Sequence, residues 1–236
     1  HLNDNDWNII TKKKTLSLSI TGSPMILQEV LLRDYIAKYG NPKLIVIELN
    51  ALISPFDKII SFKYLGLMSE NFKLIMSKYF YKQYILCEIF NLFFLNTTDY
   101  LNILHKIFVD YEQPKLLGKM TEDELQIVLN NKYTPYFQNK KYNINSLNRI
   151  INDFGDNNKF IFIITPFHEV FLEKQIEKDE WLAEIKKLVS DDRRIYDYSK
   201  SITNDEYYFD DRHLNDKGVT KLLDIMKRDN FFHELI

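Results

Sequence analysis

Short apolar runs, each the length of a buried strand, recur along this chain and are separated by segments with helical periodicity. The clearest runs are Thr15 to Ile20, Leu44 to Leu49 and Phe160 to Thr165, and a weaker fourth is Arg194 to Tyr198. They are rich in β-branched or large apolar residues, which is typical of strands that are buried on both faces of a parallel sheet. Strands that alternate with helices predict right-handed βαβ units with helices on both faces of the sheet.

Four segments have apolar residues at helical spacing: Met25 to Tyr39, Ile144 to Phe154, Glu177 to Val189, and Asn215 to Lys227. For the first of them, Ser23 is the expected N-cap, Pro24 the first helical residue, and Gly40-Asn41-Pro42 the stop signal. We therefore expect an α/β fold of three layers, α/β/α, with a parallel sheet of about five strands.

A long, mostly helical segment from Pro55 to Asn158 interrupts this alternation. It is too long for an ordinary connection, so it is either a helical cap over the carboxyl edge of the sheet or additional core. Within it, Tyr79 to Phe108 is the most apolar stretch, but charged and polar residues interrupt it, whereas a membrane span needs roughly 20 nearly uninterrupted apolar residues. We expect this stretch to be buried or to line a groove. A length of 236 residues favours one domain over residues 1–236.

Composition excludes several classes of function. The 31 basic and 33 acidic residues form no basic stripe, so nucleic acid is not an expected partner. Cys87 is the only cysteine, which excludes an internal disulfide framework and a multi-cysteine zinc site. Because Glu169 and Glu173 beside His168 form no zinc-ligand pattern and no His-Glu-x-x-His is present, we expect no metal and no cofactor.

The sharpest local signal is the segment Asp210-Asp211-Arg212-His213, followed by Leu-Asn-x-x-Gly at the start of a predicted helix. Asn215 is the expected N-cap of that helix. The three-residue spacing lets one tight turn bring the Asp210 carboxylate to Nδ1 of His213, which leaves Nε2 to take a proton from a hydroxyl nucleophile. As bare spacing, Asp-x-x-His also fits an ordinary solvated turn.

This block, Asp-x-x-His-Leu-Asn-x-x-Gly near the end of the chain, resembles the final sequence block of the SGNH (GDSL-like) hydrolase superfamily. The resemblance is closest to members that act on bacterial cell-surface polymers. Three further segments are similar to other blocks of the family: Thr21 to Pro24 to the second, Leu44 to Asn50 to the strand before the third, and Ile163 to His168 to a later strand end. The resemblance implies the flavodoxin-like SGNH fold.

The resemblance also implies a role for each matching residue. His213 would be the general base and Asp210 its orienting partner. His168 follows a strand end and should face the same edge of the sheet as His213, which makes it a candidate for substrate contact. Gly22 through its backbone N–H and Asn50 through its side-chain amide would form the oxyanion hole. Each of these residues also has a simpler interpretation: Gly22 as an ordinary turn glycine, Asn50 as a strand-end cap, and His168 in a capping or loop role.

Two departures from the family pattern matter. The third block usually reads Gly-x-Asn-Asp, whereas this chain has Glu48-Leu49-Asn50-Ala51. The first block, a Gly-Asp-Ser or Gly-Ser-Ser turn with the nucleophile, is missing, and His1 to Gly22 matches the part that follows it. We therefore expect a Gly-x-Ser turn immediately upstream of His1, with a possible membrane anchor or signal before it; the rival explanation is that His1 belongs to an expression tag. We expect structural roles for Ser23, Ser54 and Ser199.

The function implied by the resemblance is a serine esterase or O-acyltransferase that acts on acyl groups of a cell-surface glycan or teichoic-type polymer. An extracytoplasmic or membrane-associated location in a bacterium is implied, with a cytoplasmic one left open. The alternative is a catalytically silent SGNH-like domain that binds a polymer or a partner in an envelope assembly, which the degenerate third block favours. A flavodoxin-like or receiver-like binding domain also fits the alternation, but it leaves the Asp210–His213 block unexplained.

Overall fold

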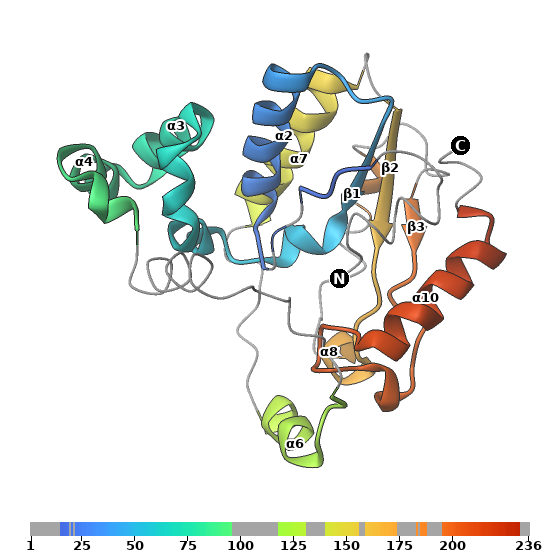
Figure 1. Cartoon of the computed structure of the whole chain (residues 1–236). Coiled ribbons are helices and arrows are strands. Elements are labelled where there is room, and N and C mark those ends of the chain that lie inside the picture. The colour runs from blue at the N-terminus through green and yellow to red at the C-terminus, as the bar shows by residue number, and fades with distance from the viewer. Residues whose placement is uncertain are drawn as a thin grey trace, which may run out of the picture.

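The structure is a computed structural model, and it describes residues 15–18, 20, 22–95, 118–130, 140–155, 159–173, 183, 185–187 and 195–231. Within these residues the chain has an α/β fold in which helices cover both faces of a small parallel sheet (Figure 1).

The sheet has three described strands in the order β1 (Leu44–Glu48), β2 (Lys159–Ile164) and β3 (Ile195–Asp197). Both pairs are parallel, so all three carboxyl ends lie at one edge. These strands confirm three of the predicted runs. The remaining run, Thr15 to Ile20, has no strand at residues 15–18 and 20, so the described residues account for three of the roughly five strands predicted. The side chain of Leu16 is 55% exposed, so this apolar run lacks the two-sided burial of a central strand.

The two faces of β2 belong to different parts of the core. Phe160, Phe162 and Ile164 pack with α2 (Met25–Tyr39) and α7 (Lys140–Phe154), where Met25, Leu32, Leu147 and Ile150 are also buried. On the opposite face Ile161 and Ile163 pack with Leu222 and Met226 of α10 (Asp216–Arg228). The alternation of side chains along a strand therefore divides the core into two layers.

The helix α2 has the predicted bounds, but Pro24 rather than Ser23 occupies its N-cap position. Because proline has no N–H and a fixed φ, it fits this position as well as the first helical one. Of the predicted helix Glu177 to Val189, the structure describes residues 183 and 185–187, which are helical, and Ile185 is buried in the core.

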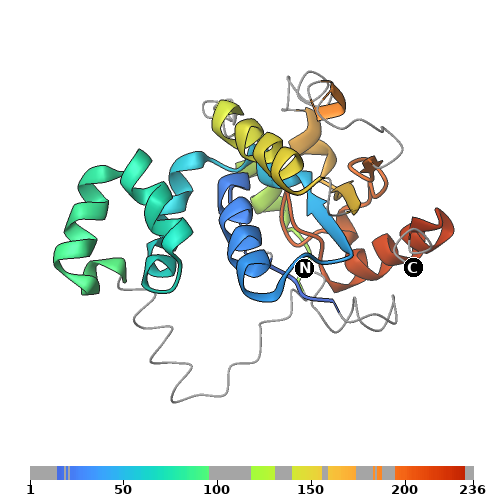
Figure 2. The same cartoon turned by 90° about the horizontal axis from the view of Figure 1, so that it is seen from above.

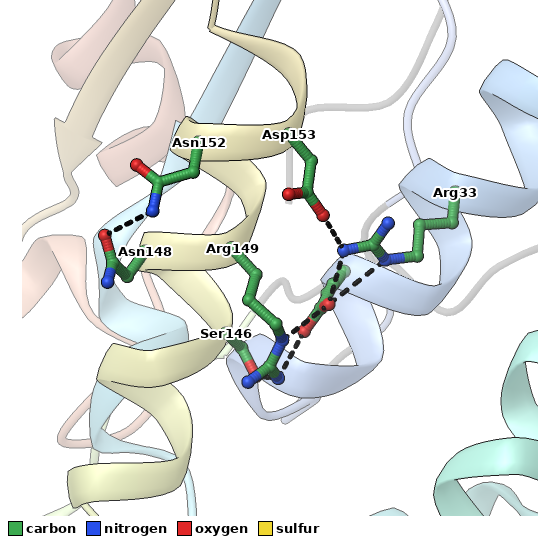
Figure 3. Close-up of polar contacts among 7 residues, drawn as sticks. Arg33, Ser146, Asn148, Arg149, Asn152 and Asp153 are labelled. Carbon is green, nitrogen blue, oxygen red and sulfur yellow. Dashed lines mark hydrogen bonds and ion pairs between the residues drawn. The ribbon is translucent and has the colours of Figure 1, made fainter.

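A buried carboxylate joins α2 to α7 (Figure 3). Glu29, which is 4% exposed, accepts hydrogen bonds from the guanidinium groups of Arg33 and Arg149. Arg33 also pairs with Asp153 of α7. A charge that is removed from water in this way needs such partners, so the network holds the two helices against each other.

The long insertion divides into parts with different places in the fold. Its helices are η2 (Phe56–Leu67), α3 (Glu70–Tyr79), α4 (Tyr81–Ile89), η3 (Asn91–Phe94), α6 (Glu122–Asn130) and α7; η1 (Leu49–Ile53) precedes them. α7 is core, while α3 and α4 lie beside α2 on the side away from the sheet (Figures 1 and 2). α6 lies beyond the carboxyl ends of the strands, near α8 (Glu169–Glu173) (Figure 1). The insertion is therefore part core and part surface.

The expectation that Tyr79 to Phe108 is buried is wrong for much of its described part, residues 79–95, while its lining a groove stays a prediction. Cys87 and Phe94 are buried, but five other large apolar side chains are 47–77% exposed: Leu86, Ile89, Phe90, Leu92 and Phe93. Helical periodicity locates an apolar stripe without telling which side of the helix faces the core. None of the described helices combines the length and the apolar character that crossing a membrane requires.

Candidate functional site

Asp210 and His213 lie on a tight loop that leads from η6 (Asp205–Tyr207) into α10. The two ends of the loop pair through an antiparallel bridge between Tyr208 and Leu214. Across it, the N–H of Phe209 donates to the carbonyl oxygen of His213 over 2.8 Å. The backbone of the loop is thereby closed on itself, and the two side chains of interest project from one rigid turn.

The predicted contact between Asp210 and His213 is present. Nδ1 of His213 lies 2.7 Å from Oδ2 and 2.9 Å from Oδ1 of Asp210. Oδ1 also accepts hydrogen bonds from the backbone N–H groups of Arg212 and His213, at 2.8 and 2.7 Å. The three-residue spacing therefore lets the carboxylate accept from its own turn and from the imidazole together.

Several influences act on the pKa of the Asp210 carboxyl group. Partial burial alone would raise this pKa, but the hydrogen bond from His213, the backbone N–H of Arg212 and the charge of His213 together lower it. Asp210 is therefore ionised at neutral pH and acts as an acceptor. When His213 is neutral, its Nδ1 must carry the proton toward Asp210, and the lone pair resides on Nε2.

Asn215 fixes the loop to the start of α10, as predicted for an N-cap. Its Oδ1 accepts a hydrogen bond from the N–H of Gly218 over 3.0 Å. Its Nδ2 donates to the carbonyl oxygen of Glu206 over 2.7 Å and to that of Gly118 over 3.2 Å. Gly218 has a second role: a Cβ there would lie 2.1 Å from the carbonyl oxygen of Tyr207. The Asn-x-x-Gly spacing thus combines a capping group with a close backbone approach.

Two contacts tie the loop to the carboxyl edge of the sheet. The N–H of His168, four residues after β2, donates to the carbonyl oxygen of Asp211 over 3.2 Å. The hydroxyl of Tyr208 lies within hydrogen-bond distance of the carbonyl oxygens of Phe167 and Ile202, at 2.9 and 2.8 Å. The loop is therefore held at the strand ends, where α/β folds usually place ligands.

His168 lies beneath this loop and is 3% exposed. Its Nε2 lies 2.9 Å from Oδ1 of Asp205, and its Nδ1 accepts from the N–H of Val170 over 3.3 Å. The ring also meets Tyr208 edge to face, with centroids 5.1 Å apart. Because both ring nitrogens have partners and the side chain is buried, these contacts favour the capping interpretation over the predicted substrate contact.

Gly22 occupies a turn before α2, which the N–H of Ser23 closes by donating to the carbonyl oxygen of Ile20 over 3.0 Å. Its φ of +70° favours glycine, and a Cβ at this position would lie 3.2 Å from Nζ of Lys58. This geometry fits the turn-glycine interpretation. The start of α2 faces the same end of the molecule as the carboxyl ends of the strands (Figure 1).

The side chain of Asn50 joins the ends of β1 and β2. Its Nδ2 donates to Oγ1 of Thr165 over 2.5 Å and lies 3.4 Å from the carbonyl oxygen of the same residue. The Thr165 hydroxyl in turn donates to Oε1 of Glu48 over 2.6 Å. These contacts direct the amide hydrogens of Asn50 at Thr165 and favour the strand-end cap, the simpler of the two interpretations. Its buried Oδ1 has no partner among the described residues.

A segment of the insertion that sequence reasoning did not connect with the site packs against the loop. The N–H of Met120 donates to the carbonyl oxygen of Tyr208 over 3.0 Å. Thr121 and Glu124 then form a capping box at the start of α6. The charge of Asp210 acts on Glu124, whose pKa is nevertheless lowered, chiefly by its hydrogen bonds to Thr121. The spacing of Thr121 and Glu124 is a sequence signal for the start of a helix. The position of this helix beside the Asp210–His213 loop depends on tertiary packing, which the spacing does not predict.

Ser23 and Ser199 are 4% and 1% exposed, in keeping with structural roles. Thr21 and the segment from His1 to Lys14 lie outside the described residues. Within the described part of the chain, no three histidine, cysteine or acidic side chains cluster as metal ligands would.

A scan against models of protein families found no match to this chain, and searches of curated proteins and of solved structures found none either. The resemblance to SGNH hydrolases therefore depends on the sequence blocks above, of which the Asp210–His213 block is the most specific.

Proposed function

We propose that this chain is an SGNH-type serine esterase or O-acyltransferase in which His213 is the general base and Asp210 orients it. The observation that carries the proposal is the contact of both Asp210 carboxylate oxygens with Nδ1 of His213. A carboxylate in this position fixes the imidazole tautomer that has its lone pair on Nε2, as the Ser-His-Asp mechanism requires.

The surroundings of this pair support the same chemistry. The loop is closed by its own backbone, capped onto α10 by Asn215 and hydrogen bonded to the segment after β2. A general base is effective when its position is set before the substrate arrives, because reorganisation during the reaction then costs little. An ordinary solvated Asp-x-x-His turn would not need these attachments.

In the proposed reaction a serine hydroxyl attacks the carbonyl carbon of an ester while Nε2 of His213 takes its proton. The C–O bond to the leaving alcohol then breaks, and His213 returns the proton to that alcohol. Water, or the hydroxyl of an acceptor, attacks the acyl-serine in the second half of the cycle. The proposal takes the serine from a Gly-x-Ser turn upstream of His1 and the first oxyanion donor from the N–H of Gly22.

The proposed substrates are O-acyl groups on a cell-surface glycan or teichoic-type polymer. The proposed location of the protein is extracytoplasmic or membrane-associated. This part of the proposal rests on the resemblance of the sequence blocks, of which the Asp210–His213 block is the most specific, and it is an analogy at the level of a family.

A serine-directed fluorophosphonate probe tests the proposal in the full-length protein. We expect covalent labelling of one serine, located by peptide mass mapping, and a labelling rate at least about 10²-fold lower in a His213→Gln variant. Lys217→Gln, an exposed change four residues away on α10, is the matched control and should label at the parent rate. Equal labelling of His213→Gln and the parent would contradict the proposal.

One observation favours the second candidate, a catalytically silent domain that binds a polymer or partner. Asn50 directs its amide at Thr165, so the second oxyanion donor of the family pattern is committed to a structural contact. For a silent domain we expect no fluorophosphonate labelling and no hydrolysis of aryl acetates, together with polymer binding that His213→Gln leaves unchanged.

A further inference from the structure

An apolar stripe runs along α4 and η3 on the side away from the core. Leu86 and Ile89 are three residues apart on one face of α4, and Phe90 is the residue directly after this helix. Leu92 and Phe93 continue the apolar surface in η3, and the rings of Phe90 and Phe93 meet edge to face with centroids 5.7 Å apart. We call these five residues the α4 stripe. Their exposed fractions are 49, 63, 58, 77 and 47% in chain order.

The stripe is not the core-facing side of these helices. That side is formed by Cys87 and Phe94, which are 2% and 1% exposed. Phe94 packs so closely on Gly66 at the end of η2 that a Cβ at Gly66 would lie 2.3 Å from its ring. The next two residues, Leu67 and Met68, are 49% and 78% exposed. Scattered exposed apolar residues need no explanation, but a concentration of this kind marks a contact surface.

The position of the stripe separates it from the Asp210–His213 loop. Both views show α3 and α4 projecting beside α2, away from the sheet, with α4 outermost (Figures 1 and 2). The Asp210–His213 loop lies at the opposite side of the molecule, at the start of α10 (Figure 1). A surface on an outermost helix is accessible to a broad, flat partner.

The charges around the stripe point to the chemistry of that partner. Residues 63–95 contain four lysines and two glutamates, a net charge of +2, whereas the whole chain carries −2. Lys73 lies 3.2 Å from Glu70 and 3.7 Å from Glu88, so both acidic groups share one lysine. The positive excess therefore comes from Lys63, Lys78 and Lys82. Lys82 precedes Leu86 by four residues and shares its helix face.

We propose that the α4 stripe inserts into the interfacial region of an anionic lipid membrane, with Lys78 and Lys82 at the headgroups. Helices that lie in a membrane interface combine exposed leucine, isoleucine and phenylalanine with lysine. Their apolar side chains enter the boundary between headgroups and acyl chains, and their lysines contact lipid phosphates. A second copy of this chain fits less well, because a twofold interface places the same patch on both subunits and would set lysine against lysine. The proposal does not depend on the proposed enzymatic function.

Vesicle co-sedimentation of the 236-residue chain tests this proposal. Vesicles of phosphatidylcholine alone are compared with vesicles that contain about one third phosphatidylglycerol, a fraction at which surface charge is substantial. We expect binding to the anionic vesicles and an affinity at least about tenfold lower for Ile89→Ser/Phe90→Ser, because two large apolar side chains are lost. Lys78→Glu/Lys82→Glu should lower the affinity for anionic vesicles by about tenfold or more, since each lysine near such a surface contributes roughly fivefold.

The matched control is Tyr39→Ser, which removes an aromatic side chain that is 63% exposed on α2 and should leave vesicle binding unchanged. Circular dichroism checks the fold of each variant, and if Ile89→Ser/Phe90→Ser unfolds, the lysine variant decides the test. Absence of binding by the parent chain, or equal binding by the variants, would overturn the proposal. A dimer detected by light scattering that Ile89→Ser/Phe90→Ser converts to monomer, without vesicle binding, would assign the stripe to a second copy instead.

Discussion

The hydroxyl of Tyr208 lies 2.9 Å from the carbonyl oxygen of Phe167, which joins the loop that carries Asp210 and His213 to the segment after the central strand. The same hydroxyl lies 2.8 Å from the carbonyl oxygen of Ile202. Tyr208 is fully buried, and burial raises its pKa, so the hydroxyl keeps its proton and remains a donor. One side chain thus contacts the backbone of Phe167, 41 residues earlier in the chain, and that of Ile202, six residues earlier.

Tyr208→Phe removes this hydroxyl and leaves two buried carbonyl oxygens without it. We expect the free energy of unfolding to fall by about 1–3 kcal/mol, the usual cost of an unsatisfied buried acceptor, as measured by urea denaturation. Tyr39→Phe, the same change at a side chain that is 63% exposed, should alter it by less than about 0.5 kcal/mol. Equal stabilities of the two variants would show that the Tyr208 hydroxyl does not hold the loop.

The carboxylate of Glu29 is the centre of the contact between α2 and α7, where it accepts from Arg33 and Arg149, both labelled in Figure 3. Glu29→Gln should destabilise the protein by about 2–4 kcal/mol in urea denaturation, because two guanidinium groups lose their common counter-charge. The side chains of Arg33 and Arg149 are 28% and 37% exposed, so solvent screens part of the effect. Asp153→Asn, at a carboxylate that is 45% exposed, should cost less than about 1 kcal/mol. A smaller effect at Glu29 than at Asp153 would contradict this account.

Local patterns in the sequence predicted the local structure around the site well. The bounds of Met25 to Tyr39 follow from Pro24 and Gly40, and the contact of Asp210 with His213 follows from their three-residue spacing. Asn215 was identifiable as a cap because its side chain acts on the N–H three residues later. Each of these features is decided within one turn of the chain.

Features that depend on distant parts of the chain were not predictable in this way. Arg149 and Glu29 are in contact although they are 120 residues apart in the sequence, and Asn50 and Thr165 are 115 apart. No local sequence pattern predicts either contact. The same limit explains the error over the α4 stripe, where apolar character was evident but its exposure depends on where neighbouring helices lie. The run from Thr15 to Ile20 has the composition of a strand without strand structure in its described residues, because composition does not supply a neighbour with which to pair.

Asn215 has two separable functions, and two variants distinguish them. Asn215→Asp keeps an oxygen that can accept from the N–H of Gly218 but loses the donors to Glu206 and Gly118. Asn215→Ala loses both. We expect Asn215→Ala to lower the free energy of unfolding by about 1–3 kcal/mol and Asn215→Asp to lower it by less. If thermal or urea denaturation ranks them in the opposite order, capping is not the dominant contribution of this residue.

The lowered pKa of Asp210 predicts a dependence of stability on pH. Its carboxylate is stabilised in the folded state by His213 and by backbone N–H groups, so it stabilises the fold above the ordinary aspartate pKa of 3.8. This contribution is lost as the pH falls through the lower folded pKa. Urea denaturation of the parent and Asp210→Asn should therefore show a stability difference at pH 7 that shrinks as the pH falls below 3.8. A difference that stays constant from pH 7 to acid would contradict the assigned role of the carboxylate.

The central claim is that Asp210 sets the tautomer of a catalytic His213, and kcat for aryl acetate hydrolysis by the full-length protein and its Asp210→Asn variant tests it most directly. Asparagine keeps an oxygen for the N–H groups of Arg212 and His213, but its amide can take the position of Oδ2 and donate to Nδ1, which moves the imidazole proton to Nε2. The account predicts a kcat lower by on the order of 10³–10⁴-fold in a folded variant, with Asp224→Asn on α10 at the parent rate. Equal kcat values for Asp210→Asn and the parent protein would contradict it.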